Sequence, residues 1–175
     1  MLHLFLVDTA LELIPPRHQQ HKSVIRGIRR FRNAGKILDS SLHHSLMQAL
    51  PHSEKRGRPD IFHHFLLDSL SSVANAKNML RIYFHCPSGV YSVDPQLRCP
   101  RDSNRFRGLM YQLLKLGHVP KQKPYYIVRS SLSLDEFILE IDPIETFIFS
   151  QNGNIDTYSH ALQHIQQIDA ASSQD

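Results

Sequence analysis

The chain has 175 residues, of which 41% are hydrophobic and 21% are charged, with a formal net charge of +4. Its two cysteines, Cys86 and Cys99, exclude a disulfide framework, and the apolar start at residues 2–7 is too short for a signal peptide or a membrane span. We therefore expect one soluble domain in a reducing, cytoplasmic setting, with no membrane partner and a mild basic bias that suits a polyanion.

Apolar runs and helical stripes alternate along the chain. Thr9 to Ile14 reads as a short helix or turn. The periodicity predicts strands at residues 2–8, 37–39, 80–84, 90–93, 125–128 and 146–149. It predicts helices at residues 24–35, 42–50, 61–73, 106–114, 133–139 and 158–168. This order indicates one α/β domain over residues 1–168 with a mainly parallel sheet and a β-hairpin insertion, followed by a polar tail at residues 169–175.

The most informative stretch is Arg56-Gly57-Arg58-Pro59-Asp60. Proline suits the first turn of a helix, and a carboxylate near that start is favoured by the exposed amides and the helix dipole. We expect a rigid corner from which Arg58 projects, with Asp60 close enough to hold its guanidinium. An arginine held in this way is suited to phosphate or a flat base edge. The alternative is an ordinary loop with solvated arginines.

A second basic group precedes the helix expected at residues 106–114. Arg98, Arg101 and Arg105, joined by Arg107, recur at spacings of about three or four. This spacing predicts one electropositive side that, together with Arg58, could hold phosphates and splayed bases of RNA. The alternative is a solvated basic face.

Two histidine pairs, His43-His44 and His63-His64, raise the possibility of a metal site. Adjacent helical residues point about 100° apart, and no cysteine or carboxylate pattern completes the set, so we expect no metal. One member of each pair is better explained as a partly buried polar residue. The chain also lacks GxSxG, P-loop and GxGxxG motifs, which removes the usual hydrolase, nucleotidase and dinucleotide hypotheses.

Several segments together resemble the ribosome-biogenesis rRNA pseudouridine methyltransferases of the SPOUT superfamily. They lie in order between residues 2 and 150: HLFLVD (3–8), ALELIP (10–15), LDSSLHH (38–44), RGRPDI (56–61), PQLRCPR (95–101), RF (105–106) and GLM (108–110). The resemblance implies an α/β knot fold, a homodimer, and transfer of a methyl group from S-adenosyl-L-methionine to N1 of a pseudouridine in small-subunit rRNA.

By the same resemblance, Arg58, Arg98, Arg101 and Arg105 contact the rRNA and Asp60 orients Arg58. The short segment before the first strand is closer to archaeal members, which implies a cytoplasmic protein, whereas a eukaryotic member would be nucleolar. The catalytic proton acceptor is not visible in the sequence.

The cofactor segment departs from the family pattern. In the family, S-adenosylmethionine sits in glycine-rich loops beyond the strand that corresponds to residues 146–149, and glycine lets the backbone approach a ligand closely. Here Gly153 is the single glycine after Gly117, so no cofactor ligands can be assigned. The expectation is therefore an incomplete knot region. The alternatives to an active enzyme are a non-catalytic rRNA-binding assembly factor and a fragment that folds poorly.

Overall fold

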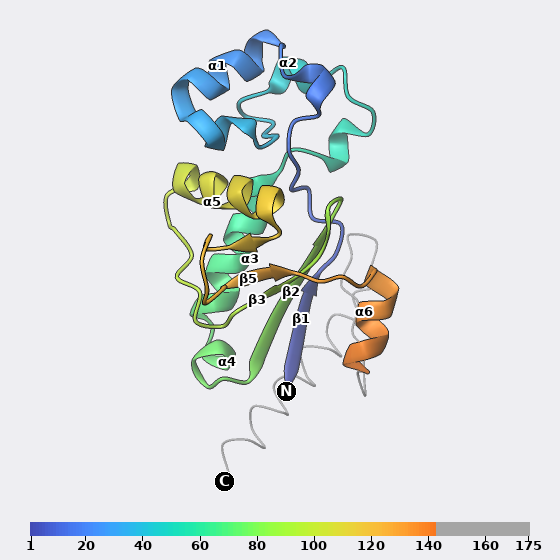
Figure 1. The fold of residues 1–175 in the computed structure, drawn as a ribbon, viewed down its shortest axis with the longest axis vertical. Helices are drawn as coiled ribbons and strands as arrows, with labels where there is room; N and C mark the ends of the chain where they lie inside the picture. The colour runs from blue at the N-terminus through green and yellow to red at the C-terminus, as the bar shows by residue number, and fades with distance from the viewer. Residues whose placement is uncertain (143–175) are drawn as a thin grey trace, which may run out of the picture. The chain divides into compact units, whose positions relative to one another are not determined.

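The computed structural model describes residues 1–142, drawn in colour in Figure 1. The chain divides into two units, Met1–Phe137 and Ile138–Asp175, and the second is described only over residues 138–142. The strands are β1 (Leu2–Leu6), β2 (Leu80–Cys86), β3 (Gly89–Val93), β4 (His118–Val119) and β5 (Ile127–Arg129). The α-helices are α1 (Lys22–Phe31), α2 (His44–Met47), α3 (Pro59–Ser71), α4 (Val73–Ala76), α5 (Ser103–Leu116) and α6 (Leu134–Ile141). The 3-10 helices are η1 (Pro16–His18), η2 (Arg32–Lys36) and η3 (Ser53–Lys55).

The strands form one sheet in the order β1-β2-β3-β5-β4. β1 runs parallel to β2, with Leu2 opposite Leu80, because the long connection between them brings the chain back to the same edge. β2 and β3 form the expected hairpin. The α/β class is confirmed. Within residues 1–142 the sheet is mixed: β1 and β2 are parallel, whereas β3 pairs antiparallel with both β2 and β5, and β4 pairs antiparallel with β5.

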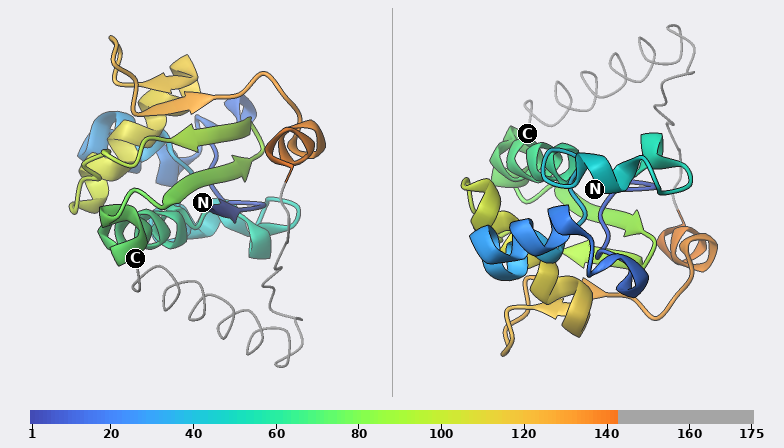
Figure 2. Two further views of the ribbon diagram at one scale, coloured as in Figure 1. Left: turned by 90° about the horizontal axis from the view of Figure 1, so that it is seen from below. Right: turned by 90° about the horizontal axis from the view of Figure 1, so that it is seen from above.

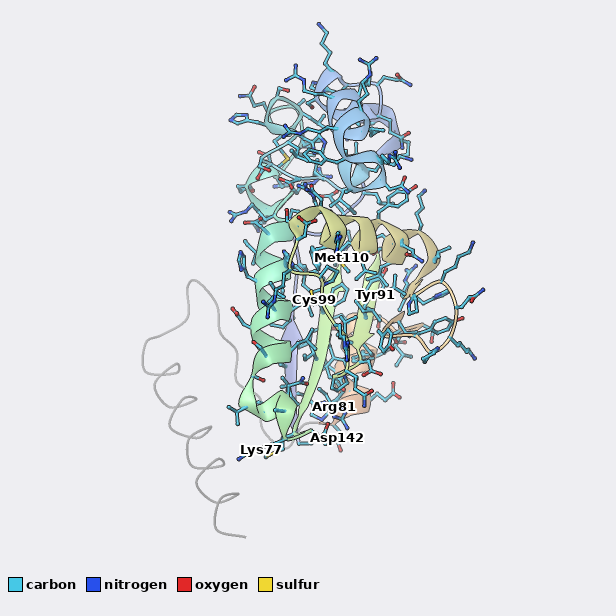
Figure 3. The ribbon with its side chains drawn as sticks, turned by 90° about the vertical axis from the view of Figure 1, so that its left-hand side faces the viewer. Lys77, Arg81, Tyr91, Cys99, Met110 and Asp142 are labelled. Atoms are coloured by element: carbon cyan, nitrogen blue, oxygen red, sulfur yellow. The ribbon has the colours of Figure 1, made fainter. Side chains whose placement is uncertain are left out.

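The main core lies between the sheet and helices α3 and α5. Alternate residues of β2 are buried on this face, as the two-residue period of a strand requires. The ring of Phe62 in α3 lies 4.3 Å from Phe84 in β2 and 5.9 Å from Phe106 in α5. Figure 3 shows Met110 of α5 and Tyr91 of β3, two further members of this core. Both views of Figure 2 show α3 beside the sheet. Packing here fixes where α3 and α5 begin.

A smaller core holds α1 and α2 together beyond α5, at the end of the sheet away from α4 (Figure 1). Its buried members are Ile14, Val24, Leu38, Leu46, Met47 and Leu50. They come from α1, α2 and the segments that lead into them, so this layer is built entirely within the β1–β2 connection. The opposite face of the sheet is met by Phe137 of α6, whose ring lies 5.2 Å from Tyr83.

Several expected elements have different bounds. Residues 9–14 form no helix or turn, and Leu13 makes an isolated bridge with Ile37 where a separate strand was expected at residues 37–39. α1 ends at Phe31, before the expected stop near Gly35, because Arg32 takes a positive φ of 52° and η2 follows. The helix expected at residues 42–50 is reduced to α2.

The strand expected at residues 146–149, the helix expected at 158–168, the polar tail and the knot region lie outside the described residues. Among the helices that are described, none combines the length and the apolar character needed to cross a membrane.

Candidate nucleic-acid interface

The loop before α3 is held rigidly by its backbone. The Gly57 carbonyl accepts a hydrogen bond from the Ser40 amide at 2.9 Å, and the Arg58 amide donates to the Ala10 carbonyl at 3.2 Å. Gly57 has a φ of +64°, and a Cβ there would lie 3.1 Å from the Met47 sulfur. Both the backbone conformation and the space therefore favour glycine at this position. The loop presents the next residue, Arg58, from a fixed point.

Arg56 stabilises this loop from inside. Its Nε and Nη2 donate to the two carboxylate oxygens of Glu12 at 2.7 and 2.5 Å. The side chains of Arg56 and Glu12 are only 21% and 15% exposed. The hydrogen bond from Glu12 raises the pKa of Arg56. The two arginines that flank Gly57 thus have different surroundings: Arg56 is committed to an internal carboxylate, whereas Arg58 faces outward.

Arg58 and Asp60 form an exposed ion pair at the start of α3. The Arg58 Nε donates to Asp60 Oδ1 at 2.9 Å, and Nη2 donates to Oδ2 at 2.7 Å. This hydrogen bonding raises the pKa of Arg58 and lowers the pKa of Asp60. Asp60 occupies the Nε–Nη2 edge of the guanidinium, and Nη1 has no hydrogen-bond partner among residues 1–142. The remaining Nη1–Nη2 edge is the one that can grip a phosphate or a base.

Arg58 lies at the wall of a pocket of about 370 Å³ where α3 and α5 begin. The pocket is lined by residues 39–41, by residues 58–60 with His63 and His64, and by Ser103, Phe106 and Arg107. Helix amino ends carry partial positive charge and unpaired amides, so two such ends at one pocket favour an anion. Sequence spacing identified Arg58 and Asp60 as site residues. It did not predict that Asp39 lines the same pocket, although the LDSSLHH segment that contains Asp39 is one of the family motifs.

His63 joins the two helices at this pocket. Its ring stacks on Phe106, with centroids 4.2 Å apart and an interplanar angle of 12°. Its Nε2 lies 2.6 Å from the Pro100 carbonyl oxygen, so α3 is tied to the segment that leads into α5. Arg101 follows Pro100 directly. The two basic segments expected from the sequence are therefore fixed to the same junction of α3 and α5.

Three of the arginines expected to contact RNA lie around the start of α5. Arg98, Arg101 and Arg105 are all exposed, and none forms an ion pair within residues 1–142. The amide of Arg105 is held by the N-cap Asp102, whose Oδ1 accepts from it at 2.8 Å. Their positive charge is thus available to solvent and to an anionic ligand.

The expectation that Arg107 shares this exposed surface is wrong. Arg107 is 6% exposed and forms a buried ion pair with Asp39, while its Nη2 donates to Asn104 Oδ1 at 2.5 Å. Its position, between Phe106 and Met110 on the inward side of α5, explains the burial. Asp39 also accepts from the Ser41 amide and hydroxyl at 2.9 and 2.6 Å. Arg107 therefore fixes the pocket wall.

The histidine pairs divide as expected into one buried and one exposed member each: His43 and His63 are buried, and His44 and His64 are exposed. The Nδ1 of His43 accepts from the Asp39 amide at 3.1 Å. Burial lowers the pKa of His43, so its ring is held neutral. No three His, Cys, Asp or Glu side chains within residues 1–142 gather as a metal site would require.

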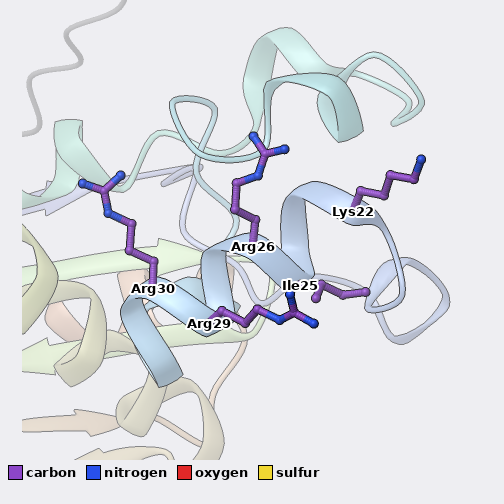
Figure 4. Close-up of a pocket in the computed structure, with 5 residues that line it drawn as sticks. All are labelled: Lys22, Ile25, Arg26, Arg29 and Arg30. Atoms are coloured by element: carbon purple, nitrogen blue, oxygen red, sulfur yellow. The ribbon is translucent and has the colours of Figure 1, made fainter.

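Neither of the two pockets described within residues 1–142 is suited to the cofactor that the resemblance implies. Besides the α3–α5 pocket, the described residues form an open hollow of about 520 Å³ on α1, lined by four cationic side chains and Ile25 (Figure 4). Four cations would repel a sulfonium ion, and the Asp39 carboxylate that lines the other pocket is already paired with Arg107. The segment to which the resemblance assigns the cofactor lies outside the described residues.

A model of the family described as EMG1/NEP1 methyltransferase matches residues 4–167. The chain belongs to this family. It is 40% identical over 156 residues to the ribosomal RNA small subunit methyltransferase Nep1 of Thermococcus sibiricus, covering 87% of this chain and 70% of the relative. It is 38% identical over 158 residues to the Nep1 of Thermococcus kodakarensis, covering 89% and 71%.

The fold also matches a solved structure of the family. The crystal structure of Archaeoglobus fulgidus Nep1 bound to S-adenosylhomocysteine superimposes with a TM-score of 0.69 at 32% identity. The match covers 79% of this chain and 64% of that one, so the chain spans just under two thirds of the solved protein. The family expected from the sequence motifs is confirmed by both comparisons.

Proposed function

We propose that this EMG1/NEP1 family chain acts in ribosome biogenesis as a small-subunit rRNA methyltransferase that grips its RNA at the α3–α5 junction. The observation that carries the proposal is the Arg58–Asp60 pair at the wall of a pocket where two helices begin. It is supported by relatives named as rRNA small subunit methyltransferases and by a family member solved with S-adenosylhomocysteine.

The junction offers three kinds of contact to a folded RNA strand. The free edge of Arg58 suits a phosphate or a base edge, because Asp60 holds the guanidinium in a fixed plane. The exposed Arg98, Arg101 and Arg105 suit phosphates on either side of that point. The amino ends of α3 and α5 add partial positive charge. Together these groups favour a bent single strand, which is how proteins usually recognise RNA loops.

The proposed target atom is N1 of a pseudouridine, as the family resemblance implies. Bound S-adenosylmethionine would supply the methyl group for this transfer. The described residues contribute placement, since they hold the RNA, and placement is a large part of the rate of such transfers. The proposal includes a homodimer and a cytoplasmic location, both of which rest on the family resemblance.

The decisive experiment is a titration with the small-subunit rRNA loop over a range of salt concentrations. Arg101→Ala removes an unpaired charge, so it should weaken binding and lower the slope of log K against log salt by about 0.7–0.9. Arg58→Ala should also weaken binding, because it removes the guanidinium edge that Asp60 holds in place and leaves the Asp60 carboxylate unopposed. Unchanged affinity in both variants would refute the site.

Asp60→Ala separates positioning from charge. Removing a carboxylate makes the surface more positive, so a purely electrostatic surface would bind RNA more tightly. If Asp60 orients Arg58, the variant binds more weakly despite the added positive charge. Lys121→Ala provides a control for nonspecific charge, since Lys121 is exposed in the loop between β4 and β5.

A second candidate function is a non-catalytic rRNA-binding assembly factor, favoured by the single glycine after Gly117. Calorimetry with S-adenosylmethionine separates the two functions. Heat of binding, together with methyl transfer to a pseudouridine-containing loop, supports the enzyme. Tight RNA binding without either signal supports the factor. A cooperative thermal melt is the control that the chain is folded.

A further inference from the structure

The strongest concentration of charge lies outside the α3–α5 junction. Between Leu13 and Leu38 the sequence has seven Lys or Arg residues and no Asp or Glu. The whole chain has 20 basic and 16 acidic residues, so the remainder has 13 against 16 and is net acidic. The net positive charge of this chain therefore comes from this one segment, which contains α1.

The charges are displayed on one exposed surface of α1, which we call the α1 basic face: Lys22, Arg26, Arg29 and Arg30. These are the exposed residues of the helix, and Val24 and Gly27 on the other side are buried. Figure 4 shows Lys22, Arg26 and Arg30 projecting from the same side, as their spacing of four residues requires. Arg29 lies along the helix toward Ile25.

No carboxylate within residues 1–142 forms an ion pair with the α1 basic face. Like charges four residues apart destabilise a helix, and Lys22 lies at the amino end, where the helix dipole disfavours a cation. The arrangement is thus unfavourable for the isolated protein. A polyanionic partner would remove the repulsion and release its own counterions.

The α1 basic face is joined to the RNA site through one aromatic ring. Phe31 is the last residue of α1. The Arg30 guanidinium lies 5.0 Å from the centroid of its ring, and the Arg107 guanidinium lies 5.3 Å from the same centroid. Arg107 in turn lines the α3–α5 pocket. The hollow on α1 and that pocket are therefore connected through packed side chains of the same unit.

We infer that the α1 basic face is a second RNA-contact surface that holds the phosphate backbone flanking the loop bound at the α3–α5 junction. This inference rests on the proposed function. Arginine favours phosphate because its planar fork donates two hydrogen bonds at once. A membrane surface fits less well, because an interfacial helix needs an exposed apolar face, whereas every exposed residue of α1 is Lys or Arg.

The test compares two rRNA fragments, the loop alone and the loop with its flanking helix, using Arg26→Ala/Arg30→Ala. Two lost phosphate contacts should lower the salt slope by about 1.4–1.8 and weaken binding of the longer fragment on the order of tenfold at 0.1 M salt. Binding of the loop alone should change much less. Arg26→Lys/Arg30→Lys should retain most of the salt slope, because the charges remain.

Lys115→Ala/Lys121→Ala is the matched control, since it removes two exposed charges elsewhere. Equal effects of the α1 variant and this control on the longer fragment would overturn the inference. If Arg58→Ala still weakened binding in that case, the proposed function would stand. Failure of the unaltered protein to bind either fragment would overturn both. Loss of binding to anionic vesicles with unchanged RNA affinity would assign the α1 basic face to a membrane instead.

Discussion

Replacing Arg107 tests whether the wall of the α3–α5 pocket depends on a buried ion pair. Arg107 and Asp39 are 6% and 8% exposed, so each charge is compensated almost entirely by the other. Arg107→Ala leaves the Asp39 carboxylate buried without its partner, which costs about 3–5 kcal/mol. Domains of this size have total stabilities of about 5–15 kcal/mol, so the loss would be a large fraction of the whole.

Urea denaturation followed by circular dichroism measures the effect. A small domain unfolds with a slope of about 1–3 kcal/mol per molar urea, so the midpoint should fall on the order of 2 M. Arg105→Ala is the matched control, two residues away on the same helix but exposed, and should change stability by less than about 0.5 kcal/mol. Combining Arg107→Ala with Asp39→Asn should cost less than the sum of the two single changes. Equal stabilities of the Arg107 and Arg105 variants would refute the argument.

Three further changes probe the parts that position the site. Gly57→Ala forces a side chain into a φ of +64° beside the Met47 sulfur and should cost about 1–3 kcal/mol in urea unfolding, with weaker RNA binding because Arg58 follows. His43→Gln should flatten the dependence of stability on pH. Burial lowers the pKa of His43 in the folded state, so below about pH 6.5 the unfolded chain binds more protons and stability falls by up to about 1.4 kcal/mol per pH unit. Phe62→Ala removes a fully buried ring between the sheet and α5 and should cost about 3–5 kcal/mol, measured as a lower melting temperature or urea midpoint.

Each of these changes has a control variant of the same kind. Gly108→Ala, in a helix with open space around the position, should be neutral or stabilising by up to about 1 kcal/mol. His44→Gln is exposed and should leave the pH dependence unchanged. Ile61→Ala, at a half-exposed position beside Phe62, should cost much less than the core change. If any variant behaves like its control, the corresponding structural explanation is wrong.

Local signals in the sequence were sufficient for the elements that carry the site. Pro59 begins α3, and Gly117, with a φ of +77°, ends α5, as each residue type predicts. The predicted start of α5 at residue 106 is three residues too late, although Asp102 is a typical N-cap residue. The apolar stripes predicted the burial of Phe62 and Leu66 in α3 and of Phe106, Met110 and Leu113 in α5. Ile61 and Val73, also assigned to the first stripe, are exposed.

The non-local pairings could not be read in this way. β3 pairs with β5 across a separation that includes α5, and nothing in either strand specifies an antiparallel partner. Glu12 and Arg56 are 44 residues apart, and Asp39 and Arg107 are 68 apart. Hydrophobic periodicity describes one helix or strand at a time. It therefore cannot distinguish an arginine that is paired with a distant carboxylate from one that has no partner.

These internal pairs change what the net charge means. A value of +4 suggests only a weak preference for anions. In the structure, however, Glu12 and Asp39 neutralise arginines that lie inside, and the segment from Leu13 to Leu38 has no acidic residue at all. The exposed arginines without an ion pair in residues 1–142 include three on α1 and three around the start of α5. Attraction of a polyanion depends on the local electrostatic field, which falls off within about 8–10 Å at moderate salt. These two surfaces should therefore attract a polyanion more strongly than the net charge of the whole chain implies.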